Sequence, residues 1–188
     1  NFYALSSYYL GSFFSPLVYF FNVQSMPDAV YLITLLKFGA IGLSAYICLH
    51  GIFSKIPRCL VLTLSTSFAL MSFAISQIEI KTWLDVFILA PLILYGFKKL
   101  IYNEGEVLYF ISLTSLFIQN YYFGFMMSIF LILWYLTQLS WNIKKIGKRF
   151  FHFVIVSLLS VITSLVMLYP TFLDLRTHGE SFSKVDSI

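Results

Sequence analysis

One stretch of the chain, residues 80–99, restricts the possible folds more than any other. Its centre is apolar, with Trp83 and Asp85 near one end and the pair Lys98 and Lys99 at the other. Tryptophan favours the interface between lipid headgroups and acyl chains, and lysines are retained at the cytoplasmic ends of membrane spans. The stretch therefore predicts a membrane-spanning helix with a carboxylate just inside its outer end.

The composition of the whole chain favours the same environment. Of its 188 residues, 60% are hydrophobic and 11% are charged, whereas soluble domains carry about 25% charged residues. The net charge of +4 does not indicate nucleic-acid binding, because the basic residues cluster at the ends of apolar runs instead of along one face. We therefore expect an all-α, polytopic membrane helix bundle that contacts membrane lipids and binds no nucleic acid.

Six spans account for the apolar runs. One helix over 107–141 would be about 52 Å long, too long for a hydrocarbon core of about 30 Å, so we divide this run at Asn120. The bundle then occupies residues 27–170, with predicted spans at about 27–53, 59–76, 82–99, 107–119, 121–141 and 150–170.

Two flanking segments complete the predicted organisation. Residues 1–26 are aromatic and are interrupted by Pro16, which favours an interfacial or re-entrant segment, although half of a truncated span would look similar. Residues 171–188 are polar after Pro170 and predict the start of an outer loop or domain. Because the chain has neither an initiator Met nor a signal peptide, we expect it to be an internal piece of a longer protein.

The basic residues predict the orientation of the spans. With six spans, the loops at 54–58, 98–106 and 142–149 lie on one side of the membrane. By the positive-inside rule that side is cytoplasmic, and the first segment, the turn at Asn120 and the tail face outward. These three loops contain eight of the twelve basic residues: Lys55, Arg58, Lys98, Lys99, Lys144, Lys145, Lys148 and Arg149.

Lys37 and Asp85 are the charged residues predicted to lie within spans. Counting about 1.5 Å per residue, and allowing the lysine stem to extend toward the interface, the two charges reach a similar depth. They would form a structural ion pair, or Lys37 would receive an anionic group such as a lipid phosphate, or it would only reach a headgroup. Asp85 is the candidate catalytic base or binder of sugar hydroxyls or of a metal, and a helix-end acid without such a role remains the alternative.

Aromatic and amide side chains are predicted to surround this pair at the outer face. Trp83, Asn120, Tyr121 and Tyr122 are candidate substrate-binding residues, because aromatic rings stack on sugars and amides bond to hydroxyls. Interfacial anchoring would equally explain the tyrosines. The spacing of the three histidines supports no metal site.

Several segments resemble the YfhO family of bacterial multi-pass membrane proteins, in order along the chain. They are Asn1–Leu10 with Ser15-Pro16, Leu35–Gly39 with Gly42-Leu43-Ser44, Trp83-Leu84-Asp85 with Pro91-Leu92, Asn120–Met126, and Tyr169-Pro170-Thr171. Together they cover nearly the whole chain.

The resemblance implies a GT-C-type glycosyltransferase in the bacterial plasma membrane, with its active face outward. The donor would be a polyprenyl-phosphate sugar, the acceptor a cell-envelope polymer such as lipoteichoic acid, and the chemistry an inverting transfer; a need for a divalent metal is left open. Such enzymes generally place a catalytic acid in the first outer loop, which is expected to precede this chain, so Asp85 is the weaker candidate for that role. The alternative is a transporter or lipid flippase that uses Lys37 and Asp85 as a relay.

Overall fold

The computed structural model describes residues 12–139 and 146–185, which contain helices and no strand. Two short 3-10 helices, η1 (Ser15–Phe20) and η2 (Val23–Ser25), lead into α2 (Met26–Ile52). The chain continues through α3 (Arg58–Ala69), α4 (Ser72–Ser76), α5 (Lys81–Tyr102), α6 (Val107–Gln119), α7 (Tyr121–Leu139) and α8 (Ile146–Val185). The predicted all-α membrane bundle is confirmed.

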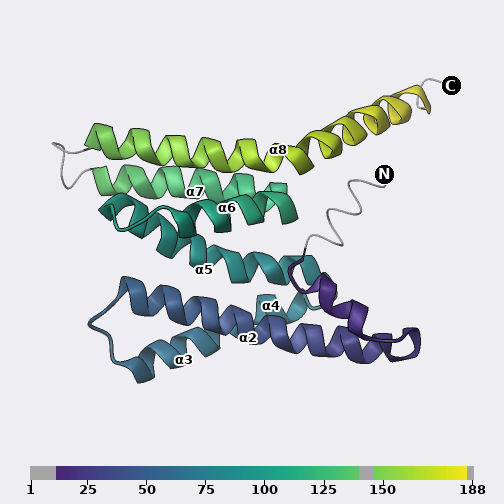
Figure 1. Cartoon of the computed structure of the whole chain (residues 1–188), viewed down its shortest axis with the longest axis horizontal. Coiled ribbons are helices and arrows are strands. Elements are labelled where there is room, and N and C mark those ends of the chain that lie inside the picture. The colour runs from purple at the N-terminus through teal and green to yellow at the C-terminus, as the bar shows by residue number, and fades with distance from the viewer. Residues whose placement is uncertain (1–11, 140–145, 186–188) are drawn as a thin grey trace.

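Helix α5 lies in the middle of the bundle. It packs most extensively on α2 and α6, so α2, α3 and α4 form one side of the molecule and α6, α7 and α8 the other (Figure 1). One buried cluster joins α5 to the second side through Val86, Leu89 and Ile93. A smaller cluster joins it to the first side through Leu84, with Ile41 and Ala69. The stretch that the sequence placed at the centre of the fold therefore contacts both sides of the bundle.

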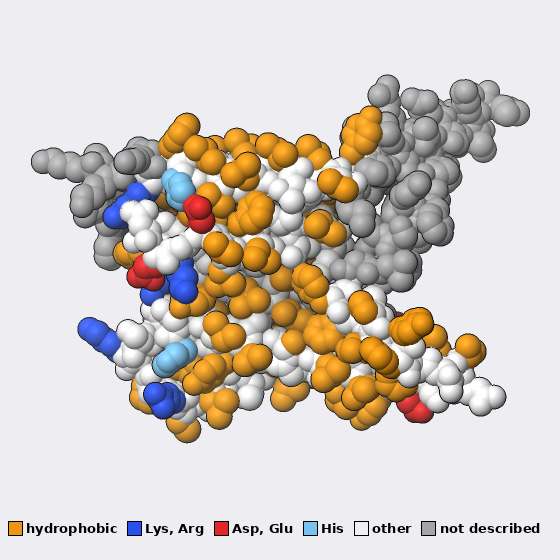
Figure 2. Space-filling view, viewed as in Figure 1, with side chains coloured by type: hydrophobic (Ala, Val, Ile, Leu, Met, Phe, Trp, Pro, Cys, Tyr) orange, Lys and Arg blue, Asp and Glu red, His pale blue; other side chains and the backbone are white. Residues whose placement is uncertain are grey.

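The described helices have lengths suited to a bilayer. Within the described residues, three segments are long and apolar enough to cross a membrane: Val23–Ile52, Arg58–Ser76 and Arg149–Val166. Two shorter apolar helices cover Val107–Gln119 and Tyr121–Thr137. Apolar side chains cover most of the visible face, and the described Lys and Arg side chains on it gather near one end of the bundle (Figure 2). This distribution agrees with the orientation predicted from the loops.

Two helix boundaries differ from the prediction. The interval predicted as one span over 59–76 contains two helices, because the chain leaves the helical conformation at Leu70 and Met71. Neither Pro nor Gly marks this break, and Thr66 Oγ1 donates to the carbonyls of Leu62 and Thr63 in the turn before it. The sixth helix also runs past Pro170 to Val185, where a loop was expected. An internal proline can kink a helix without ending it, and α8 bends along its length (Figure 1).

Polar contacts fix the C-terminal end of α5 and join it to the end of α2. At the end predicted to be cytoplasmic, Lys98 Nζ donates to the carbonyls of Gly51 (3.0 Å) and Ile52 (2.9 Å), which are the last residues of α2. A cation in this position satisfies helix-terminal carbonyls and complements the helix dipole. Asn103 then adopts a left-handed conformation (φ 58°) that ends α5.

A seam of hydroxyls joins α6 to α8. Tyr109 Oη lies 2.8 Å from Ser157 Oγ, and Ser160 and Ser164 donate at 3.5 Å to the carbonyls of Phe110 and Thr114. The residue numbers rise together along both helices, so α6 and α8 are parallel. Small hydroxylated residues allow this close approach in a lipid environment.

Gly96 provides a test of the α5–α6 contact. A Cβ atom at this position would lie 2.6 Å from the backbone nitrogen of Tyr109 and 2.8 Å from its Cα, so backbone would have to shift. We expect Gly96→Ala to lower the free energy of unfolding by about 1–3 kcal/mol. Gly39→Ala is the matched control, because a Cβ there meets nothing within 4 Å. Equal unfolding free energies for the two variants, measured in detergent micelles, would contradict this packing.

Candidate functional site

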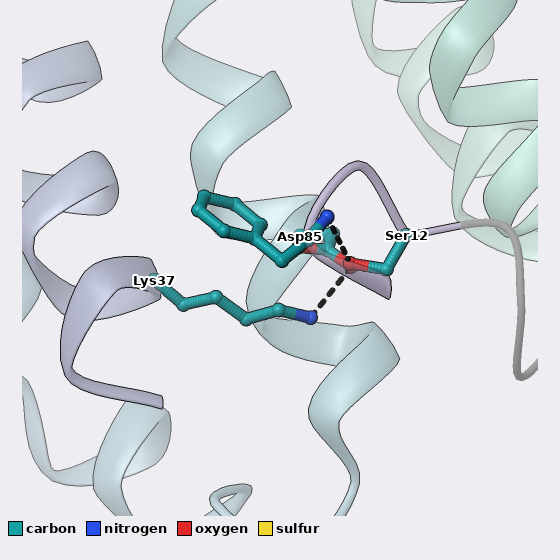
Figure 3. A network of polar contacts seen from close by, with 4 residues as sticks. Ser12, Lys37 and Asp85 are labelled. Carbon is teal, nitrogen blue, oxygen red and sulfur yellow. Dashed lines mark hydrogen bonds and ion pairs between the residues drawn. The ribbon is translucent and has the colours of Figure 1, made fainter. Parts of the chain in front are cut away.

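Lys37 and Asp85 form a buried ion pair between α2 and α5. Lys37 Nζ donates to Asp85 Oδ2 at 2.8 Å, and the two side chains are 2% and 1% exposed. Of the three alternatives left open for Lys37, the structure contains the ion pair, which the similar depth of the two charges allows. Figure 3 shows the two side chains pointing toward each other from neighbouring helices.

The helical period explains why Lys37 points inward. The face of α2 that packs against its neighbours includes Ile33, Lys37, Ile41 and Ala45, which recur every four residues. Lys37 therefore occupies a position that an apolar residue would otherwise fill. A lone ammonium would be very costly there, and the Asp85 carboxylate makes the site electrically neutral.

The segment before α2 covers the pair. Ser12 is buried beside it, and its Oγ accepts a hydrogen bond from the backbone nitrogen of Phe14 at 3.3 Å. The Lys37 ammonium also lies 5.8 Å from the centre of the Phe14 ring, within the range of a cation–π contact. Any anion that reaches Lys37 must therefore pass this segment or displace the Asp85 carboxylate.

The predicted aromatic and amide residues lie near the same end of α5, in different environments. The Trp83 ring packs edge-on against Phe123, with centroids 5.2 Å apart. Tyr121 and Tyr122 are 50% and 61% exposed. Asn120 is buried, and its Oδ1 accepts from the backbone nitrogen of Phe123 at 3.3 Å, so it caps the start of α7.

Two further polar residues lie at this end and are not among those predicted from the sequence. Thr82 and Gln119 are buried, and the Thr82 hydroxyl and both amide atoms of Gln119 have no hydrogen-bond partner in the described part of the chain. Asp85 Oδ1 also has no hydrogen-bond partner among the described residues. Gln119 could have been identified because it is adjacent to Asn120 in the sequence. Thr82 could have been identified because it lies one turn before Val86, on the face of α5 that packs against α6.

The donor atoms of this end suit polar organic groups better than a metal. Among the described residues, no group of three or more His, Cys, Asp or Glu side chains gathers in one place. What the arrangement offers is one ammonium, one carboxylate oxygen that can still accept, an amide, a hydroxyl and three exposed or partly exposed rings. Such a set can bind a phosphate or sugar hydroxyls.

Removal of one member of the ion pair should be more harmful than removal of both. Lys37→Met leaves the Asp85 carboxylate buried and unpaired, and we expect the free energy of unfolding to fall by about 3–5 kcal/mol. The double variant Lys37→Met/Asp85→Leu should regain most of this loss. Lys55→Met, at an exposed position, is the control and should unfold like the wild type. Equal destabilisation of the single and double variants would contradict the role assigned to the pair.

Comparison with known proteins places the chain in a family. The model of the family described as "Bacterial membrane protein YfhO" matches residues 1–188. Neither a curated protein nor a solved structure matches the chain significantly. The match covers the full sequence and agrees with the long apolar helices, so the chain belongs to the YfhO family of bacterial membrane proteins.

Proposed function

We propose that this chain is part of an integral membrane glycosyltransferase that moves a sugar from a polyprenyl-phosphate donor to a cell-envelope polymer, such as lipoteichoic acid, at the outer face. The observation that carries the proposal is the buried Lys37–Asp85 pair at the end of α5 opposite the basic loops. Ionisable residues inside a membrane bundle are costly, and they usually mark a functional site. Trp83, Tyr121 and Tyr122 beside this end supply rings of the kind that stack on sugars.

The pair supports defined roles in the transfer. As the acceptor hydroxyl attacks the anomeric carbon, the bond from that carbon to the donor phosphate breaks, and negative charge grows on the departing phosphate. Lys37 would stabilise this charge. The hydroxyl proton must go to a base, for which Asp85 is the candidate within this chain, second to an acid expected upstream of it.

An apolar groove on the α3 side of α2 suits the donor's hydrocarbon chain. It has a volume of about 540 Å³ and lies between α2 and α3, lined by Phe38, Gly42, Tyr46, Leu62 and Ala69 among others. Phe38, which lines the groove, directly follows Lys37 in the sequence. A lipid whose phosphate is bound by Lys37 could therefore place part of its chain in this groove while the rest remains in the bilayer.

Sugar transfer by the full-length protein in proteoliposomes tests the proposal. We expect the wild type to move labelled sugar from a polyprenyl-phosphate donor onto lipoteichoic acid, and Lys37→Met and Asp85→Asn to reduce transfer at least tenfold. The informative variant is Lys37→Met/Asp85→Leu, which should remain folded and yet inactive. Recovery of transfer in this double variant would show that the pair is only structural. No transfer by the wild type, with several donors and acceptors, would refute the function itself, and Lys55→Met should retain full activity.

A transporter or lipid flippase is the second candidate, because a buried Lys–Asp pair inside a bundle also suits a translocation relay. Single cysteines placed at positions 37, 85 and 120, in a background with Cys48→Ser and Cys59→Ser, distinguish the two. A transferase should react with membrane-impermeant maleimide from outside only. Labelling from both sides that changes with the conformational state would favour the transporter.

A further inference from the structure

Three buried side chains at the outer end of α5 and α6 have hydrogen-bonding capacity that the protein does not use. Thr82, Asp85 and Gln119 are 7%, 1% and 5% exposed. Thr82 Oγ1, Asp85 Oδ1 and both amide atoms of Gln119 have no partner among the described residues. Buried polar atoms in proteins are nearly always hydrogen-bonded, and each exception is costly. Three such exceptions close together point to polar groups that come from outside the described part of the chain.

The register between α5 and α6 places the three residues at one depth. Gly96 packs against the backbone of Tyr109, and the helices are antiparallel with equal rise per residue. Val86 precedes Gly96 by ten residues, and Gln119 follows Tyr109 by ten residues. Gln119 therefore lies level with Val86, next to Asp85 in the sequence. The contact between Trp83 and Phe123, near the start of α7, shows that the turn after α6 lies beside the outer end of α5.

The faces of the helices agree with the register. Val86, Leu89 and Ile93 form the stripe of α5 that packs in the same cluster as Leu116 and Phe117 of α6. Thr82 lies four residues before Val86, so it extends this stripe toward the outer end. Asp85 lies four residues before Leu89 and borders the same interface on the side of α2. The three side chains therefore flank one region between the helices.

The chemistry of the cluster selects the ligand class. Lys37 neutralises Asp85 at 2.8 Å, so the cluster carries no net charge and has no preference for a cation. Its unused capacity comprises a carboxylate oxygen that accepts, an amide that both donates and accepts, and a hydroxyl that does both. Neighbouring hydroxyl groups on a neutral ring, each a donor and an acceptor, complement all of them.

We propose that Thr82, Asp85 Oδ1 and Gln119 form a binding site for the hydroxyl groups of a sugar ring. The inference rests on the proposed glycosyltransferase function and deepens it, because it assigns sugar contacts to Thr82 and Gln119. Asn120 already uses its side-chain oxygen to cap α7, and Tyr121 and Tyr122 are half-exposed or more. Asp85 holds Lys37 with one carboxylate oxygen and presents the other to the ligand.

Binding of free monosaccharides to the full-length protein in nanodiscs provides the test. Glucose, galactose and N-acetylglucosamine are the probes, and the readout is protection from hydrogen–deuterium exchange over residues 80–87 and 115–121, titrated to give an affinity. We expect at least one probe to protect both segments of the wild type. Gln119→Leu and Thr82→Val should each weaken this binding at least tenfold. Gln119→Leu should also leave the melting temperature unchanged or raise it, because it removes an unsatisfied amide.

Matched controls separate a local effect from a general one. Thr63→Val removes an exposed hydroxyl that bonds within its own helix, and Gln24→Leu changes an exposed amide; both should bind the probes as the wild type does. A large fall in melting temperature for Gln119→Leu with unchanged sugar binding would overturn the inference, because the amide would then serve the fold. Absence of protection by all three probes in the wild type would also overturn it.

Sugar transfer measured on the same variants separates this inference from the proposed function. Transfer by the wild type that does not depend on Gln119 or Thr82 would overturn the sugar site and leave the transferase intact. Protection by a probe without transfer to any acceptor would support the sugar site and refute the transferase. A raised KM for the donor in Gln119→Leu, with little change in kcat, would support both.

Discussion

The ion pair between Lys37 and Asp85 is the interaction on which the arrangement of α2 and α5 depends. An ammonium and a carboxylate cannot be left separately in a lipid-like interior, because each carries a desolvation cost of several kcal/mol. At a separation of 2.8 Å, the attraction between the two charges offsets part of that cost. The position of the short aspartate side chain also restricts where the longer lysine can place its charge. Since α5 also packs against α6, a constraint on its contact with α2 affects both sides of the bundle.

Other polar and close-packing contacts hold the rest of the bundle in register around this pair. Lys98 closes the far end of α2, Gly96 allows the backbone of α6 to approach α5, and Ser160 and Ser164 allow α8 to approach α6. Lipid provides little hydrophobic driving force between helices, so close packing and hydrogen bonds of this kind carry more of the association than they would in water. These contacts are spread along α5 and α6. Among the described residues, the buried side-chain atoms without a hydrogen-bond partner lie at the outer end, except for Thr114 Oγ1 in the middle of α6.

The sequence predicted the parts of the structure that follow from lengths and from charges in apolar surroundings. The division at Asn120 came from the thickness of the bilayer, and the meeting of Lys37 with Asp85 came from depth along two spans. The break at Leu70 and Met71 had no such signal, because neither Pro nor Gly lies near it in the sequence. The sequence identifies a polar turn at Gln119 and Asn120, but it does not show which of the two amides caps a helix and which has no partner among the described residues.

The geometry of the pair also relates the two binding roles to each other. Lys37 cannot bind a phosphate closely while Asp85 occupies its ammonium, so a donor phosphate at Lys37 would have to displace the carboxylate. The freed carboxylate would then carry an uncompensated charge beside Gln119 and Thr82, where the hydroxyl donors of a bound sugar would stabilise it. Phosphate binding and sugar binding would therefore favour each other.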